Sequence, residues 1–285
     1  PVPQEQWERW LAEADAVYSS GNIRIDEALL RKAPKVQVIA QASVGYDNFD
    51  VAACRAHQVK IGNTPGVLVN AVADLAYGLL LDTARNIVRG HRHVAEGLWA
   101  QKKAPGMGVD LYGKTLGIVG LGDIGSAIAR RAQVSGMRVI YHNRHRKLND
   151  SALGVTYAAW EELLRTSDFI VVAVTLNPST QGLFDAAAFA AMKEGVRFVN
   201  ISRGKVVDTE ALVAALQSGK VAAAGLDVTD PEPLPGDHPL LRLPNITVTP
   251  HIASATEETR DAMALVTAQN IVAALAGEVM PAQIR

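Results

Sequence analysis

The chain has few of the features that mark secreted, membrane or nucleic-acid-binding proteins. It has one cysteine, Cys54, in 285 residues, so no disulfide can form within the chain and a reducing compartment such as the cytoplasm is expected. Its uninterrupted apolar stretches, such as Phe169 to Val174, are all far shorter than the roughly 18 residues that indicate a membrane span. Lys and Arg (28) nearly balance Asp and Glu (29), and no basic excess points to nucleic acid or an anionic membrane as a partner.

The length and the hydrophobic pattern are typical of a two-domain α/β protein. A chain of 285 residues suits two domains of about 150 residues each. From Lys114 onward, short apolar runs alternate with amphipathic segments, which predicts a parallel sheet covered by helices on both faces. The expected strands are Thr115–Val119, Arg138–Asn143, Phe169–Val174, Arg197–Ser202, Val221–Val228 and Ile246–Thr249. The expected helices between them are Ile124–Ser135, Trp160–Thr166, Asp185–Met192 and Thr209–Gln217.

The N-terminal part continues this α/β pattern less regularly. Lys35–Ala42 and Val59–Ile61 are expected to be strands, with a helix at Phe49–His57 between them. The segment Asn70–Ile87 has apolar residues at helical spacing on more than one face, so we expect a buried helix, placed at a contact between subunits. The last helix, Glu257–Ala276, is expected to return to the N-terminal region.

A glycine turn directly follows the first strand of the regular pattern and opens a helix. It reads Gly120-Leu121-Gly122-Asp123-Ile124-Gly125. The first glycine permits the tight turn, and the second lets the backbone approach a pyrophosphate. The third allows the helix to pack close to the strand, with its N-terminus facing the anion. Glycine turns are common, but one placed between a clear strand and a clear helix predicts a dinucleotide site.

The end of the next strand indicates which dinucleotide is bound. An NAD site usually has an Asp or Glu about 20 residues after the glycines, where it binds the ribose 2′-hydroxyl. Asn143 stands at that place here, followed by Arg144, His145 and Arg146. A carboxylate would repel a 2′-phosphate, whereas arginines offer it paired donors, so NADP is favoured over NAD. The alternative is that these cations only form a solvated turn.

Three later strands each lead to a polar residue that could take part in chemistry. Arg203, Asp227 and His251 follow one another at intervals of 24 residues, which is about the length of one strand with its crossover. Parallel strands would therefore bring all three to the same edge of one sheet, where open α/β folds bind their ligands. Glu232 lies five residues after Asp227 and is expected at the same edge.

These residue types match what the reduction of a 2-keto acid requires. Arg203 can hold the carboxylate with two parallel hydrogen bonds and polarise the carbonyl. His251 can protonate the developing alkoxide, since imidazole titrates near neutral pH, and Glu232 can keep that imidazole charged. Taken singly, Arg203 could be a surface residue and Glu232 part of a turn. No metal is expected, because His91-Arg92-His93 lacks the further ligands that a metal site needs.

Several motifs, found in order from about Lys35 to the C-terminus, resemble the D-isomer-specific 2-hydroxyacid dehydrogenase family. They are Ser43-Val44-Gly45-Tyr46-Asp47, the run from Gly117 to Gly125, Asn200-Ile201-Ser202-Arg203-Gly204, Gly225-Leu226-Asp227-Val228 with Pro231-Glu232-Pro233-Leu234, and the run from Pro250 to Thr256. Within the family, the nearest resemblance is to glyoxylate/hydroxypyruvate reductases. It lies in Asn143-Arg144, in the run from Asp230 to Pro235 and in Gly277-Glu278-Val279-Met280-Pro281.

The resemblance implies roles for particular residues. Arg203, Glu232 and His251 would be the catalytic set. The backbone amides of Val44 and Gly45 and the hydroxyl of Ser254 would hold the substrate carboxylate together with Arg203. Cofactor contacts would come from the glycine turn, from Asn143, Arg144, His145 and Arg146, and from Thr175, Ile201, Asp227 and Ala253.

The resemblance also implies the domain plan and the oligomeric state. Residues 66–252 would form an NADP-binding and dimerisation domain with a Rossmann-type parallel sheet of strand order 3-2-1-4-5-6-7. A flavodoxin-like substrate domain would combine residues 1–65 and 253–285. Family members normally have a strand further upstream, so this domain is expected to be incomplete at its N-terminus. The family is dimeric through the nucleotide domain, which implies a homodimer here.

The activity implied by the resemblance is reduction of glyoxylate or hydroxypyruvate to the 2-hydroxy acid, with NADPH as the cofactor. One alternative is 2-ketogluconate or another 2-keto acid, reduced by the same residues. A second alternative is no enzyme at all but a dinucleotide-sensing scaffold, since this fold also serves as a transcriptional co-repressor. The scaffold would be expected to have an exposed peptide groove and long unstructured extensions.

Overall fold

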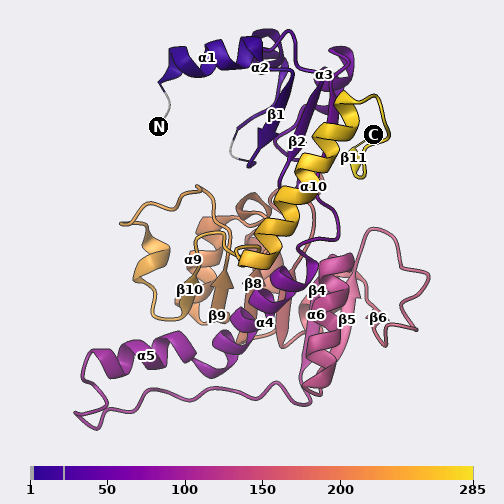
Figure 1. The fold of residues 1–285 in the computed structure, drawn as a ribbon. Coiled ribbons are helices and arrows are strands. Elements are labelled where there is room, and N and C mark those ends of the chain that lie inside the picture. Colours follow the sequence, from indigo (N-terminus) through magenta and orange to yellow (C-terminus); the bar gives the residue numbers. More distant parts are fainter. Residues whose placement is uncertain (1–2, 22, 285) are drawn as a thin grey trace. The chain divides into compact units, whose positions relative to one another are not determined.

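The computed structural model describes residues 3–21 and 23–284, which fold as two compact α/β units (Figure 1). The larger unit is Val69–Ala253. The smaller unit combines the chain up to Leu68 with the segment from Ser254 onward. The C-terminal helix α10 (Glu257–Leu275) packs on strands from the N-terminal segment, which confirms its predicted return.

The larger unit is built on a parallel sheet, with seven strands among the described residues. They are β4 (Thr115–Val119), β5 (Arg138–His142), β6 (Thr156–Tyr157), β7 (Phe169–Val172), β8 (Val196–Asn200), β9 (Val221–Leu226) and β10 (Ile246–Val248). Their order across the sheet is β6-β5-β4-β7-β8-β9-β10, and every neighbouring pair is parallel. Numbered along the chain, this is the predicted order 3-2-1-4-5-6-7, and the chain reverses direction across the sheet between β4 and β7.

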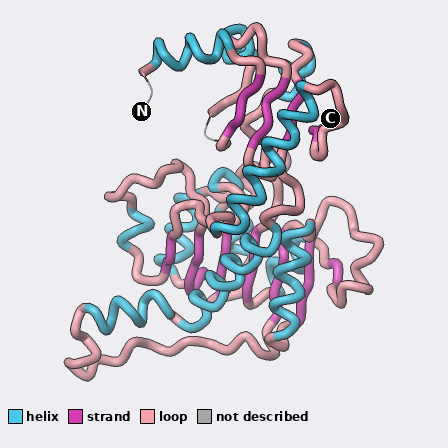
Figure 2. Tube along the Cα trace, viewed as in Figure 1, coloured by secondary structure: helices cyan, strands magenta, loops and turns pink. Residues whose placement is uncertain are grey.

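Helices cover both faces of this sheet (Figure 2). One face carries α4 (Val69–Arg85) and α6 (Asp123–Val134), and the other carries α7 (Trp160–Thr166), α8 (Ala186–Ala191) and α9 (Thr209–Ser218). On the second face the rings of Phe184, Phe189 and Phe198 are fully buried and pack with centroids 5.0 to 6.2 Å apart. All six strands and four helices predicted from the sequence of this region are present, with ends that agree with the prediction or differ by one or two residues.

The predicted helix Asn70–Ile87 is confirmed as α4, which ends two residues earlier, and a second helix that was not predicted follows it. Asn86 has a left-handed backbone (φ 56°), a conformation in which asparagine is enriched, and it separates α4 from α5 (Ile87–Ala95). The several apolar faces of α4 are buried within the chain, because α4 packs against α6, β8, β9 and β10. Its Leu79 lies over Gly225 of β9, where an added Cβ would be only 3.0 Å from the Leu79 Cβ. Burial of α4 therefore needs no second subunit.

The helix α5 and the segment 96–112 form an arm that extends from the sheet (Figure 1). None of the α5 residues is buried. The arm is attached at its end, where the Val109 amide donates to the Ala84 carbonyl and a Cβ on Gly108 would overlap that same carbonyl. Its exposed apolar side chains are Ile87, Val94, Trp99, Met107 and Tyr112.

The smaller unit is a second α/β layer structure. Its sheet has the order β1-β2-β3-β11, in which β1 (Ala16–Ser19), β2 (Val38–Gln41) and β3 (Lys60–Gly62) are parallel and β11 (Gln283–Ile284) is antiparallel. Helices α1 (Gln4–Glu13), α2 (Glu27–Lys32) and α3 (Val51–Ala56) accompany α10. The predicted strands β2 and β3 and helix α3 are confirmed, whereas α1, β1, α2 and β11 were not anticipated.

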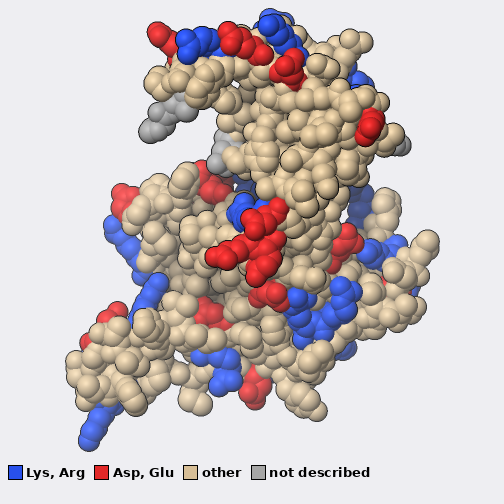
Figure 3. All heavy atoms as spheres, in the orientation of Figure 1, with Lys and Arg blue, Asp and Glu red and all other residues tan. Residues whose placement is uncertain are grey.

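Membrane-spanning helices are absent from the part of the chain that the structure describes. No helix there is long and apolar enough to cross a bilayer. On the face drawn in Figure 3, acidic and basic side chains are interspersed, as the net charge of −1 suggests.

Candidate active site

The glycine turn between β4 and α6 has space for a ligand beside its second glycine. Gly120 has φ 100°, and a Cβ there would overlap the Ala173 carbonyl, while a Cβ on Gly125 would overlap the Gly120 carbonyl. At Gly122, by contrast, a Cβ would meet nothing within 4 Å, so the protein's own packing does not require a glycine. The α6 N-terminus also has no side-chain cap. Both features fit a pyrophosphate that approaches the backbone at Gly122 and faces the helix N-terminus.

Asn143 joins the end of β5 to this glycine turn. Its Oδ1 accepts a hydrogen bond from the Leu121 amide at 2.7 Å. Asn143, which stands where an NAD site would have an acid, therefore also stabilises the glycine turn. Next to it, Arg144 is exposed, and its Nη2 lies 3.3 Å from the Ser179 hydroxyl. Ser179 belongs to the turn after β7, which begins at the exposed residue Thr175. Arg144 therefore lies beside the loop after β7, which also contains Thr175, a predicted cofactor contact.

Arg146 is engaged differently from Arg144. Its Nε lies 2.7 Å from Asp150 Oδ2, and its Nη2 lies 3.4 Å from Oδ1. Asp150 is only 4% exposed, and the Arg146 guanidinium holds the pKa of that carboxyl below its usual range. The charge of Arg146 is already matched by a carboxylate, whereas Arg144 contacts a neutral hydroxyl. The positions of the two arginines in the sequence did not indicate that only Arg146 is paired with a carboxylate.

The three predicted strand-end residues lie at one edge of the sheet. The strands β8, β9 and β10 are parallel neighbours and end at Asn200, Leu226 and Val248. Arg203, Asp227 and His251 follow these ends within three residues. Because parallel strands end at the same edge, this confirms the arrangement that the 24-residue intervals predicted.

The Arg203 turn is held by a residue that sequence reasoning missed. Buried Asn200 donates from Nδ2 to the Arg203 carbonyl (3.0 Å), and its Oδ1 accepts from the Ser202 amide (3.0 Å) and hydroxyl (2.7 Å). At the following residue, Gly204, a Cβ would overlap the Thr229 carbonyl. The turn that carries Arg203 thus packs directly on the backbone that leads to Glu232.

Asp227 fastens the turn that carries His251. Its side chain is 1% exposed and accepts three hydrogen bonds. Oδ1 accepts from the Thr249 hydroxyl (2.7 Å) and the Ile252 amide (2.8 Å), and Oδ2 accepts from the Ala253 amide (2.9 Å). Between these donors, His251 has a left-handed backbone (φ 53°), which costs a non-glycine residue about 1–2 kcal/mol. The carboxylate of Asp227 therefore holds His251 in an otherwise unfavourable conformation.

His251 and Glu232 lie in hydrogen-bond contact, the contact expected from the sequence. His251 Nδ1 lies 2.6 Å from Glu232 Oε1, with the two side chains 45% and 41% exposed. The hydrogen bond from His251 lowers the pKa of Glu232, and the positive charges of His251 and Arg203 act in the same direction. Glu232 is thus a carboxylate at neutral pH. Its contact with Nδ1 leaves Nε2 as the ring nitrogen that can act on a substrate.

The residues expected to hold the substrate carboxylate belong to the smaller unit. Val44 and Gly45 lie in the loop after β2, and Ser254 is the first residue of the C-terminal segment. Within the residues described, the amides of Val44 and Gly45 donate no hydrogen bond. Unpaired N–H groups on consecutive residues are suitable donors for an anion.

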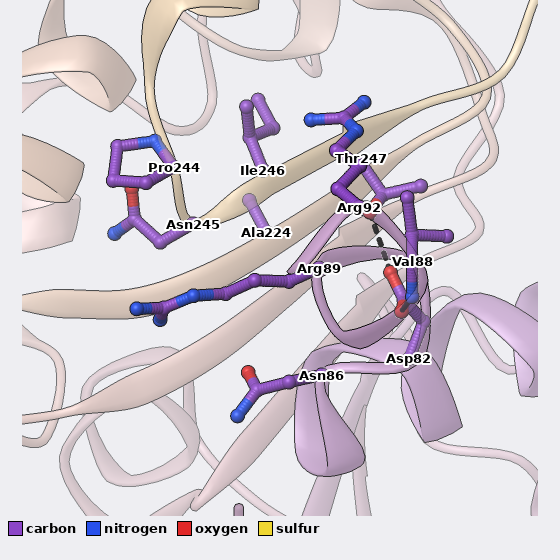
Figure 4. A pocket seen from close by; sticks show the side chains of 10 residues that line it. All are labelled: Asp82, Asn86, Val88, Arg89, Arg92, Ala224, Pro244, Asn245, Ile246 and Thr247. Carbon is purple, nitrogen blue, oxygen red and sulfur yellow. Dashed lines mark hydrogen bonds between the residues drawn. The ribbon is translucent and has the colours of Figure 1, made fainter. Parts of the chain in front are cut away.

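A separate small pocket, open to solvent, lies at the opposite edge of the larger sheet (Figure 4). It is lined by Asp82, Asn86, Val88, Arg89, Arg92, Ala224, Pro244, Asn245, Ile246 and Thr247. These include the start of β10, whereas His251 follows its end. Asp82 already accepts from the Thr247 hydroxyl (2.5 Å) and the Val88 amide (2.7 Å). This pocket therefore lies away from His251 and Glu232. The Asp82 carboxylate in it is already bound by hydrogen bonds within the protein.

No group of three or more His, Cys, Asp or Glu side chains is placed to hold a metal ion in residues 3–21 and 23–284.

A parallel sheet with a glycine turn at its switch point and a paired His and Glu at the same edge is the arrangement expected of a dinucleotide-dependent oxidoreductase. Residues 77–253 match a family model described as the NAD binding domain of D-isomer specific 2-hydroxyacid dehydrogenases. The match covers more than half of the chain. This chain belongs to the D-isomer specific 2-hydroxyacid dehydrogenase family.

Known relatives agree with this assignment. The chain is 43% identical to a glyoxylate reductase of Pyrococcus furiosus, over 98% of this chain and 85% of the relative. It is 44% identical to a glyoxylate/hydroxypyruvate reductase B of Citrobacter koseri, over 98% and 87%. The crystal structure of a glyoxylate reductase from Paecilomyes thermophila superimposes with a TM-score of 0.90 at 36% identity, over 99% of this chain and 88% of that one.

Proposed function

We propose that this chain reduces a small 2-keto acid, glyoxylate or hydroxypyruvate, to its 2-hydroxy acid and uses NADPH in preference to NADH. The observation that carries the proposal is the 2.6 Å pair of His251 and Glu232, which stands at the same sheet edge as Arg203 and the glycine turn. Relatives named for these two substrates, at 43% and 44% identity, support the substrate class. The buried, unpaired Cys54 is compatible with the cytoplasm as the compartment.

The chemistry follows from the positions of these side chains. A bound nicotinamide would supply the hydride for the C2 carbon. Arg203 would bind the carboxylate and draw electron density from the C2 carbonyl. His251 would donate its Nε2 proton to the carbonyl oxygen as that oxygen becomes a hydroxyl, while Glu232 on Nδ1 stabilises the imidazolium. The Val44 and Gly45 amides and the Ser254 hydroxyl would orient the substrate through its carboxylate.

The test is a panel of 2-keto acids assayed with each cofactor, on wild-type protein and on Arg144→Ala. Wild-type kcat/KM should be highest for glyoxylate or hydroxypyruvate with NADPH. Losing the exposed Arg144 guanidinium should raise the KM for NADPH by roughly 10- to 100-fold, the value of a charged hydrogen bond, and leave NADH nearly unchanged. Arg146→Ala is the matched control, because its guanidinium is bound to Asp150 and its loss should lower stability without changing cofactor choice.

Other outcomes of this panel would change the proposed cofactor role, substrate or function. An equal NADPH penalty in Arg146→Ala would show that both arginines hold the 2′-phosphate. Equal weakening of NADPH and NADH in Arg144→Ala would reject a 2′-phosphate role. Faster turnover of 2-ketogluconate than of glyoxylate would move the substrate to a larger 2-keto acid. Tight dinucleotide binding with no turnover of any 2-keto acid would favour the sensing scaffold.

We also propose that the protein is a homodimer and that the arm formed by α5 and residues 96–112 contacts the second copy. The arm exposes Trp99 (70%) and Val94 (53%), and burying such side chains favours association. Light scattering after size exclusion should give twice the mass of one chain, and Trp99→Glu should shift the population towards one chain. Val279→Glu, at an apolar residue in the smaller unit that is even more exposed (83%), should not. A wild-type monomer would contradict the proposal.

A further inference from the structure

The loop after β2 is held from beneath by a buried amide, Gln41, the last residue of that strand. Gln41 is 1% exposed. Its Nε2 donates to the Gly45 carbonyl (2.8 Å) and lies 2.7 Å from the Ser43 hydroxyl, which itself donates to the Gly45 carbonyl at 2.6 Å. Its Oε1 accepts from Asn48 Nδ2 (2.8 Å) and the Ser19 hydroxyl (3.2 Å). Every polar atom of this side chain is therefore used.

Three consecutive carbonyls of the loop are each tied back into the smaller unit. The Ser43 carbonyl accepts from the Thr64 amide (3.0 Å), and the Val44 carbonyl accepts from Asn63 Nδ2 (2.9 Å). The third is the Gly45 carbonyl, bound by Gln41. Asn63 is itself fixed, because its carbonyl accepts from Asn270 Nδ2 of α10 at 3.0 Å. The loop is thus clamped from two sides, by β2 and by the chain that follows β3.

The direction of the loop's N–H groups follows from these contacts. A trans peptide points its C=O and its N–H in opposite directions. When the carbonyls of Ser43, Val44 and Gly45 point inward, the amides of Val44, Gly45 and Tyr46 must point the other way. None of these three amides donates a hydrogen bond within the described residues. Gly45 has no side chain to restrict its backbone, so the direction of these donors depends on the clamp.

We propose that Gln41 is a positioning residue for the substrate carboxylate, which it serves by fixing the amides of Val44, Gly45 and Tyr46 in an anion-binding direction. This role rests on the proposed function, in which that loop binds the carboxylate. Gln41 itself touches no substrate. It acts through the Gly45 carbonyl, and Asn63 acts in the same way through the Val44 carbonyl.

The test compares Gln41→Leu, which keeps the volume but removes the hydrogen bonds, with wild-type protein. The KM for glyoxylate should rise roughly tenfold or more, with kcat much less affected, as expected when ground-state binding is lost. NADPH affinity should be unchanged, because the cofactor residues belong to the larger unit. Ser19→Ala is the matched control. It removes a buried hydrogen bond to Gln41 Oε1 but none to the loop, so it should lower stability and leave the KM unchanged.

A second readout does not depend on turnover. In ¹⁵N-labelled full-length protein, oxalate should shift the Val44, Gly45 and Tyr46 amide resonances, and Gln41→Leu should need roughly tenfold more oxalate. Asn63→Ala releases the clamp from its other side and should act in the same direction, which covers the case that Gln41→Leu does not fold. Identical oxalate titrations in wild type and both variants, or no shift in wild type, would overturn the inference. An oxalate difference without turnover of any 2-keto acid would reject the proposed function alone.

Discussion

Replacing His251 by alanine should lower the turnover of glyoxylate by roughly 10²–10⁴, the usual contribution of a positioned general acid. The reason is local, since Nε2 of His251 is the ring nitrogen left available by the 2.6 Å contact of Nδ1 with Glu232. Binding of NADPH, measured by fluorescence titration, should be retained because the glycine turn is unchanged. Full activity in His251→Ala would remove His251 from the mechanism.

The matched variant Glu232→Gln separates the charge of the pair from its geometry. Glutamine can keep the hydrogen bond to Nδ1 but carries no charge to stabilise the imidazolium and does not titrate, so kcat should fall and the acid limb of the rate–pH profile that Glu232 causes should disappear. In the wild type, the His251 hydrogen bond lowers the pKa of Glu232 from its ordinary value of 4.5. Glu232 should therefore stay negatively charged as the pH falls towards 4.5, and it should be protonated only below that pH. Superimposable profiles for Glu232→Gln and wild type would show that the carboxylate is not needed for proton transfer.

The parts of this structure that the sequence predicts well are those that a local pattern determines. The strand Thr115–Val119 was predicted with its observed bounds, because a continuous apolar run between Lys114 and a glycine turn permits little else. The expected strands Phe169–Val174 and Arg197–Ser202 instead end at Val172 and Asn200. Apolar residues continue past both strand ends, where the Ala173 and Ile201 amides still donate to the Val119 and Val172 carbonyls, and pattern alone does not show where the chain leaves the sheet.

The parts that the sequence does not predict depend on contacts between distant segments. Gln41 is a neutral amide at a strand end. The residues next to it in the sequence do not indicate that its side chain contacts Gly45 and Ser19. The pairing of Arg146 with Asp150 has a four-residue spacing, but the segment is not helical, so that spacing carries no signal. Asn86 could have been identified as a helix break, since asparagine tolerates the left-handed backbone. These positions decide how the candidate site is held rather than which chemistry it offers.

Asp227→Asn should lower kcat/KM by about 10²-fold, the effect of a displacement of about 1 Å at a reacting group. The two amides that hold the His251 turn donate to different oxygens, Ile252 to Oδ1 and Ala253 to Oδ2. Asparagine has one carbonyl oxygen, so its NH₂ group must face one of these donors. A buried amide left without an acceptor costs about 1–3 kcal/mol, and the left-handed conformation of His251 loses its support. A lower melting temperature should accompany the loss of activity.

The same variant distinguishes two roles for Asp227, because the sequence placed it among the cofactor-binding residues whereas the structure shows its side chain holding the His251 turn. If it positions His251, the dissociation constant for NADPH should not change while kcat falls. If it contacts the nicotinamide, NADPH binding should weaken in proportion to the loss of kcat/KM. Thr249→Val is the control, because it removes the hydroxyl donor to Asp227 Oδ1 and leaves both amide hydrogen bonds in place. We expect Thr249→Val to keep most of the activity, since the two amides alone define the turn from which His251 acts.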